Sequence, residues 1–137
     1  MKDVTIKIEI SQSAPGGEEE VFELTTDGEY SHESGVSVFS YTEGVFTGYV
    51  GRQTTFTVNP ECVVLHRSEG NAEMVFSEKE KHHFFQETEH GFLTMGIDTG
   101  RIRQKLGDDG GALEIDYTVA VDSITVSRNS FRIDIRV

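Results

Sequence analysis

Residues 91–121, GFLTMGIDTGRIRQKLGDDGGALEIDYTVAV, contain two strand-like runs separated by a double-glycine turn. In the second run every other residue from Leu113 to Val121 is apolar, and the intervening residues include Glu114, Asp116 and Thr118. Successive side chains of a strand point to opposite faces of its sheet, so the run predicts a strand with one buried and one wet face. Gly110-Gly111 supplies the positive-φ conformations that a tight reversal needs.

The same two-residue period recurs along the chain, with turn signals about every 8–12 residues, as in sandwiches and up-and-down barrels. It predicts further strands beginning near Val4, Val21, Val36, Thr54, Val63, Ala72 and His82. We find no pattern typical of a long helix. The sequence therefore predicts an all-β protein of about 8–10 antiparallel strands in which residues 1–137 form one β-barrel domain.

Two stretches leave local alternatives open, and a third predicts a break in the alternation. Asp27-Gly28 predicts that the second strand either stops or bends there. Residues 100–106 carry Ile102 and Leu106, whose spacing suits a short helical turn or a continuing strand. Phe131, Ile133, Ile135 and Val137 share a parity that Ile124 and Val126 do not, which predicts a β-bulge near residues 127–130.

The charge of the chain bears on its partners, and its apolar pattern and cysteine content bear on its location. Acidic residues outnumber basic ones 24 to 12, for a net charge of −12, and a field of this sign repels nucleic acid and anionic lipid. The amino-terminal residues alternate rather than form an apolar core, and no apolar run approaches the length of a membrane span. The single Cys62 has no intramolecular disulfide partner. We expect a cytoplasmic protein that binds neither nucleic acid nor membrane.

An ordered set of short motifs resembles the YwiB-like family, bacterial proteins of unknown function with a calycin-like β-barrel. The motifs are Thr25–Tyr30, Ser40–Glu43, Val64–Arg67 followed by Gly70, Met74–Phe76, Gly91–Thr94, Ile97–Thr99, Ile102 with Leu106, and Gly110–Tyr117. The resemblance spans residues 6–135 and implies an antiparallel barrel shaped like those of lipocalins and fatty-acid-binding proteins. The chain has no Trp and so lacks the Gly-x-Trp signature of true lipocalins. The resemblance implies no particular function.

Catalytic and metal-binding patterns are absent from the sequence. It contains no Gly-x-Ser-x-Gly elbow, phosphate-binding glycine loop or His-Glu-x-x-His motif. Cys62 lies in an apolar run, as a packed thiol does. His82 and His83 are adjacent on a strand and would point to opposite faces. We therefore expect no enzyme activity, no catalytic residues, no metal site and no cofactor.

One set of residues combines charge with apolar neighbours of the same parity. Phe39 shares its parity with Tyr41 and Glu43, and Leu65 shares its parity with Arg67. If this parity faces inward, Glu43 and Arg67 either form a structural ion pair that plugs the barrel or anchor a ligand, because a buried charge must be paired. Otherwise these charges face solvent.

The ligand-anchor interpretation predicts a function. Small barrels either hold one small ligand or are filled by their own side chains. Our hypothesis is a non-enzymatic barrel that binds a small, partly apolar molecule through Phe39, Tyr41, Glu43, Leu65 and Arg67. The alternative is a protein-interaction or structural module with a filled barrel and an exposed apolar patch. An enzyme would instead need histidines and carboxylates clustered at a barrel mouth.

Overall fold

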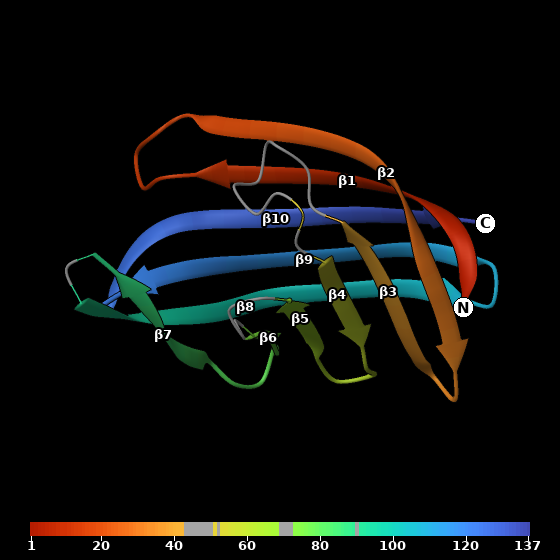
Figure 1. Cartoon of the computed structure of the whole chain (residues 1–137). Helices are drawn as coiled ribbons and strands as arrows, with labels where there is room; N and C mark the ends of the chain where they lie inside the picture. Colours follow the sequence, from red (N-terminus) through yellow and green to blue (C-terminus); the bar gives the residue numbers. More distant parts are fainter. Residues whose placement is uncertain (43–50, 52, 69–72, 90) are drawn as a thin grey trace.

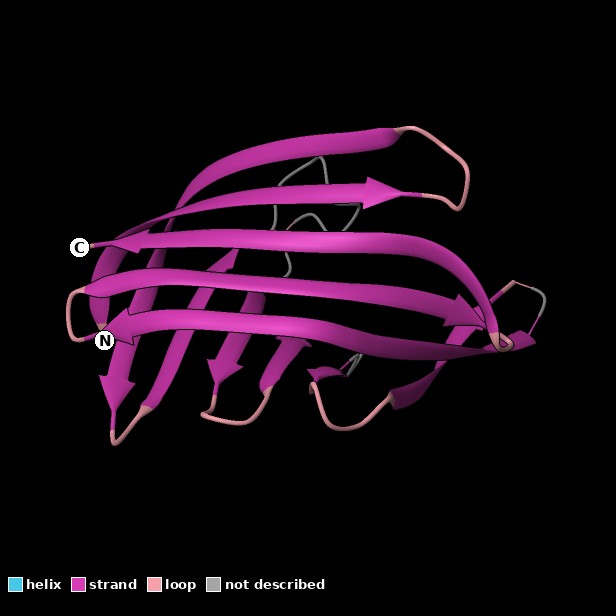
Figure 2. Ribbon diagram, turned by 180° about the vertical axis from the view of Figure 1, so that it is seen from behind, coloured by secondary structure: helices cyan, strands magenta, loops and turns pink. Residues whose placement is uncertain are grey.

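The computed structural model describes residues 1–42, 51, 53–68, 73–89 and 91–137, and its regular elements are all β-strands (Figures 1 and 2). The strands are β1 (Lys2–Ser13), β2 (Glu19–Glu33), β3 (Val36–Thr42), β4 (Gln53–Val58), β5 (Val63–Arg67), β6 (Glu73–Phe76), β7 (His82–Thr88), β8 (Gly91–Gly107), β9 (Gly110–Val121) and β10 (Ile124–Arg136).

The ten strands of the described residues form one antiparallel sheet in the order β6-β5-β4-β3-β2-β1-β10-β9-β8-β7. The amino-terminal β1 pairs with the carboxy-terminal β10, and the edge strand β6 approaches β7 and β8 without a hydrogen-bonded ladder. The sheet therefore curls into a nearly closed barrel, which confirms the predicted calycin-like fold. None of the described residues belongs to a helix long and apolar enough to cross a membrane.

The barrel has two walls of different length. The long strands β1, β10, β9 and β8 form one wall, and the shorter β3, β4 and β5 cross it at a steep angle (Figures 1 and 2). Strand β2 runs beside β1 and then bends into the second wall, where Gly28 begins its pairing with β3. The bend alternative at Asp27-Gly28 is the one observed. A side chain at Gly28 would collide with the Ser40 carbonyl oxygen, so glycine permits the two strands to approach closely there.

The β8–β9 hairpin follows the sequence pattern closely. Gly110 and Gly111 have φ angles of +97° and +141°, as the turn prediction requires. Residues 100–106 continue β8, so the strand alternative is the one observed there. A register shift between Thr99 and Arg101 then resets which residues of β8 face inward.

The bulge in β10 lies slightly earlier than the predicted range. The register with β9 shifts between Thr125 and Ser127, so Val126 is the extra residue and is exposed. From Ser127 onward alternate residues of β10 turn inward, and Phe131, Ile133 and Ile135 are buried. The prediction began the bulge at Ser127 because sequence parity shows only that a break occurs before Phe131.

Aromatic rings join the two walls. Phe39 and Phe56 stack with centroids 4.8 Å apart, and Phe56 meets the edge of Phe131 at 6.1 Å. Phe76 packs against Tyr117 with ring centroids 4.8 Å apart, and this contact holds β6 against the long wall. Burying a side chain of this size contributes about 1.5–3 kcal/mol to the stability of the folded state, so this cluster holds the two walls together.

Candidate functional site

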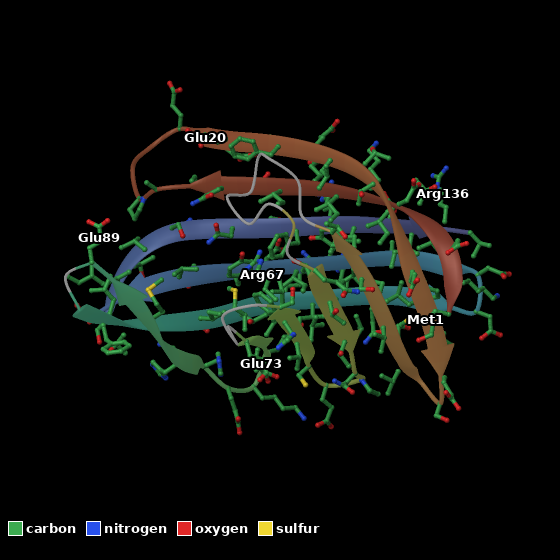
Figure 3. All side chains as sticks on the ribbon, viewed as in Figure 1. Met1, Glu20, Arg67, Glu73, Glu89 and Arg136 are labelled. Atoms are coloured by element: carbon green, nitrogen blue, oxygen red, sulfur yellow. The ribbon has the colours of Figure 1, made fainter. Side chains whose placement is uncertain are left out.

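The structure places four of the five predicted ligand-binding residues on the inner face of the barrel. Phe39 and Leu65 are 0% and 1% exposed, and Tyr41 is also buried. Arg67, at the end of β5, is half-buried (Figure 3). The predicted inward parity is therefore observed for these residues, whereas Glu43 lies outside the described residues, so the Glu43–Arg67 pair stays a prediction.

The inner face changes from apolar to polar between two neighbouring rows of cross-strand partners. The apolar row runs from Tyr30 through Phe39 and Phe56 to Leu65. The next row, two residues along each strand, consists of Gly28, Tyr41, Thr54 and Arg67. Phe39 has no accessible surface, so no space large enough for a water molecule adjoins its ring. Phe39 and Leu65 are thus packed core residues beneath a polar row.

Two residues of the long wall complete this polar region, and the sequence did not identify them as site residues. Thr99 on β8 and Tyr117 on β9 are cross-strand partners, and both are buried. Burial raises the pKa of the Tyr117 phenol, and the positive charge of Arg67 offsets part of that rise. We call Tyr41, Thr54, Arg67, Thr99 and Tyr117 the inner polar cluster.

Thr99 carries an unusual polar atom. Its Oγ1 is fully buried, and no hydrogen-bond partner for it exists among the described residues. A buried hydroxyl without a partner costs roughly 1–3 kcal/mol, and such groups in native structures often mark a water, an ion or a ligand. Tyr117 shares the parity of the apolar residues of its strand, and Thr99 belongs to a run that alternates like the other predicted strands. Neither residue therefore differs from its neighbours in a way that would mark a binding site in the sequence.

The inner polar cluster is rich in hydrogen-bond donors. A guanidinium only donates, and a phenol whose pKa is raised keeps its proton at neutral pH. Among the described residues the cluster contains neither histidine nor carboxylate. Its donors can bind a hydrogen-bond acceptor of a ligand.

The histidines are scattered over the barrel. His66 is exposed on β5, His83 is exposed on β7, and His32 is half-buried at the far end of β2. His90 lies outside the described residues. The described residues contain no group of three or more His, Cys, Asp or Glu side chains that could hold a metal ion.

A second polar region lies on the outer face of the long wall. Small hydroxyl side chains of β1 and β10, including Ser11, Ser13 and Ser130, leave an open hollow of about 520 Å³ beside Asp116 and Arg128. Ser130 donates a hydrogen bond of 2.8 Å to Asp116, and Ser11 donates one of 3.1 Å to Glu19. These carboxylates already bind neighbours within the sheet, so the hollow is weaker evidence for a ligand than the buried Thr99 hydroxyl.

Comparison with known proteins places the chain in a family. A family model described as a domain of unknown function, DUF1934, matches residues 6–133. The chain belongs to the DUF1934 family. The crystal structure of the ywiB protein from Bacillus subtilis is similar to this DUF1934 barrel with a TM-score of 0.77 and 20% identity, over 96% of this chain and 90% of that one. This likeness shows the shared barrel fold. No curated protein matches the DUF1934 chain by sequence.

Proposed function

We propose that this DUF1934 protein is a non-enzymatic, cytoplasmic barrel that binds a small, partly apolar molecule at the inner polar cluster. The observation that carries the proposal is the Thr99 hydroxyl, which is buried and has no hydrogen-bond partner among the described residues. A ligand or an ordered water that bonded to this hydroxyl would remove its desolvation cost. The single Cys62, which has no intramolecular disulfide partner, supports the cytoplasmic assignment.

The neighbours of Thr99 indicate which end of the ligand would lie there. Arg67 supplies a positive charge and fixed donors, and Tyr117 supplies a protonated phenol in a buried setting. These groups favour a ligand whose polar end accepts hydrogen bonds. Phe39 and Leu65 then form the packed apolar floor that supports the inner polar cluster from beneath.

A protein-interaction module is the second candidate, because several apolar side chains are exposed. Val21 and Phe22 are both about half exposed near the start of β2, and Phe92 and Ile124 are 72% and 69% exposed near the starts of β8 and β10, towards the same end of the long wall. Exposed apolar surface of this kind is typical of contact sites when it is contiguous. This candidate predicts concentration-dependent association that Phe22→Ser weakens, and no ligand inside the barrel.

Native mass spectrometry of the protein after exposure to a metabolite extract tests the proposal. We expect a retained small molecule in the unmodified protein and in Thr25→Val, whose threonine is exposed on β2. Thr99→Val has the same change of composition but removes the buried hydroxyl, so a much smaller fraction of this variant should retain the molecule. Equal retention by both variants would place the ligand elsewhere. A barrel that retains nothing, together with association that depends on Phe22, would favour the interaction module.

A further inference from the structure

The far end of the barrel contains a chain of hydrogen bonds that the inner polar cluster does not include. Tyr30, at 0% exposure, donates its hydroxyl proton to the Gly107 carbonyl oxygen at 2.6 Å. The Tyr30 hydroxyl oxygen also lies 3.2 Å from Ser37 Oγ, and Ser37 Oγ lies 2.7 Å from His32 Nδ1. Ser37 is almost fully buried, so these protein groups satisfy its hydroxyl.

The directions of these bonds follow from the number of protons. A carbonyl oxygen can only accept, so the single hydroxyl proton of Tyr30 is committed to Gly107. Ser37 must therefore donate its own proton to Tyr30, and it has none left for His32. The bond between Ser37 and His32 then requires that His32 Nδ1 carries the proton. In its neutral form His32 presents an unprotonated Nε2.

This arrangement also excludes one catalytic interpretation. A histidine that activates a serine must accept the serine proton. Here the Ser37 proton points to Tyr30, and Ser37 is buried, so His32 and Ser37 do not form a nucleophile–base pair. The bond to Ser37 instead holds the imidazole ring in one orientation, with Nε2 on the side away from the serine.

His32 borders a hollow of about 460 Å³ that is also lined by Met1, Lys2, Tyr30, Ser31 and Asp108. The Lys2 ammonium donates to the Asp108 main-chain oxygen at 2.9 Å and lies 3.6 Å from an Asp109 carboxylate oxygen, so the positive charge of Lys2 is already engaged. Nε2 of His32 and the Asp108 carboxylate are hydrogen-bond acceptors. Acceptors at the border of a hollow suit a ligand that brings N–H donors.

We infer that this hollow is a second binding site, which takes a small organic cation of the primary-amine class and uses His32 Nε2 as a hydrogen-bond acceptor. The hydrogen bonds from Ser37 to Tyr30 and from His32 to Ser37 position the His32 ring, because they fix its tautomer and its orientation. The site lies on the other side of the apolar Tyr30–Leu65 row from Arg67, so it is separate from the inner polar cluster.

The first part of the test reads the tautomer directly. Long-range ¹H–¹⁵N spectra of the labelled protein, recorded at a pH where the signals themselves show a neutral ring, should show His32 protonated at Nδ1 and unprotonated at Nε2. Tyr30→Phe keeps the ring but frees the Ser37 proton to bond to Nδ1, so the population with a proton on Nε2 should rise. A His32 that is protonated at Nε2 in the unmodified protein would overturn the inference.

The second part tests the ligand class with methylammonium chloride, and with sodium acetate at the same ionic strength. Methylammonium should give a saturable shift of the His32 resonances, and acetate should give none. His32→Asn retains a donor near Nδ1 but lacks Nε2, so it should bind methylammonium about tenfold more weakly or worse, whereas the exposed-site control His66→Asn should bind normally. The inference is wrong if acetate alone binds, if methylammonium gives no saturable shift, or if His32→Asn binds it unchanged.

Discussion

Thr99 on β8 lies directly across from Tyr117 on β9, and both side chains are buried on the inner face of the barrel. Cross-strand partners on one face have Cβ atoms about 4.5–5.5 Å apart, so two hydroxyl-bearing side chains are held as close neighbours. The register shift that follows Thr99 keeps Ile102 facing inward further along β8. The pair therefore places two hydroxyl groups beside the apolar Ile97 and Ile115 of the same wall.

Replacing Thr99 by valine should stabilise the free protein. Valine has nearly the same shape but lacks the hydroxyl that has no partner among the described residues. Removing such a group should raise the free energy of unfolding by about 1 kcal/mol. Urea denaturation of Thr99→Val beside Thr25→Val measures the effect, and the exposed Thr25 variant should differ little from the unmodified protein. A clear loss of stability in Thr99→Val would show that Oγ1 has a bound water or other partner.

Stability should fall at high pH through Tyr117. Its folded-state pKa is raised above the unfolded value of about 10, so the folded protein retains a proton that the unfolded chain releases. The stabilising contribution is complete below pH ~10 and is lost as the pH rises through the folded pKa, by at most about 1.4 kcal/mol per pH unit. Unfolding free energies measured from about pH 8 to about pH 11 should therefore decline less steeply in Tyr117→Phe than in the unmodified protein. Identical slopes in the two proteins would contradict the assignment.

Phe56 should be among the costliest side chains to truncate. It stacks on Phe39 and meets Phe131, so it contacts both walls of the barrel. Phe56→Ala should lower the free energy of unfolding by about 3–5 kcal/mol, through lost burial and the cavity that remains. Phe92→Ala removes the same ring from a position that is 72% exposed and should change stability by less than about 0.5 kcal/mol. Similar losses in the two variants would show that Phe56 does not join the walls.

Gly28 should not tolerate even a methyl group. A Cβ at this position would overlap the Ser40 carbonyl oxygen of the neighbouring strand, so β2 and β3 would have to separate where β2 bends. Gly28→Ala should destabilise the protein by about 1–3 kcal/mol, as overpacking does. Gly107→Ala is the matched control, because a Cβ there has no atom within 4 Å. Thermal unfolding followed by circular dichroism compares the two, and equal melting temperatures would refute the steric argument.

The residues of the candidate site were partly predictable. Phe39, Tyr41 and Leu65 are buried, as inward parity required, because alternation along one strand needs no knowledge of the other strands. Thr99 and Tyr117 were not identified because their significance lies in their pairing with each other and in the approach of Arg67. Those contacts join strands that are distant in the sequence.

The sequence by itself determined the strands, their buried faces and the tight turn at Gly110-Gly111, since alternation and positive-φ glycines act within a few residues. It also showed that β10 must contain a bulge, although not its position. Only the tertiary structure decided that β1 pairs with β10, that β2 bends into the second wall, and that Arg67 and Tyr117 act on each other. The physical reason is that the alternation along one strand decides which face of the sheet a side chain occupies. The curling of the whole sheet decides which side chains of distant strands it contacts.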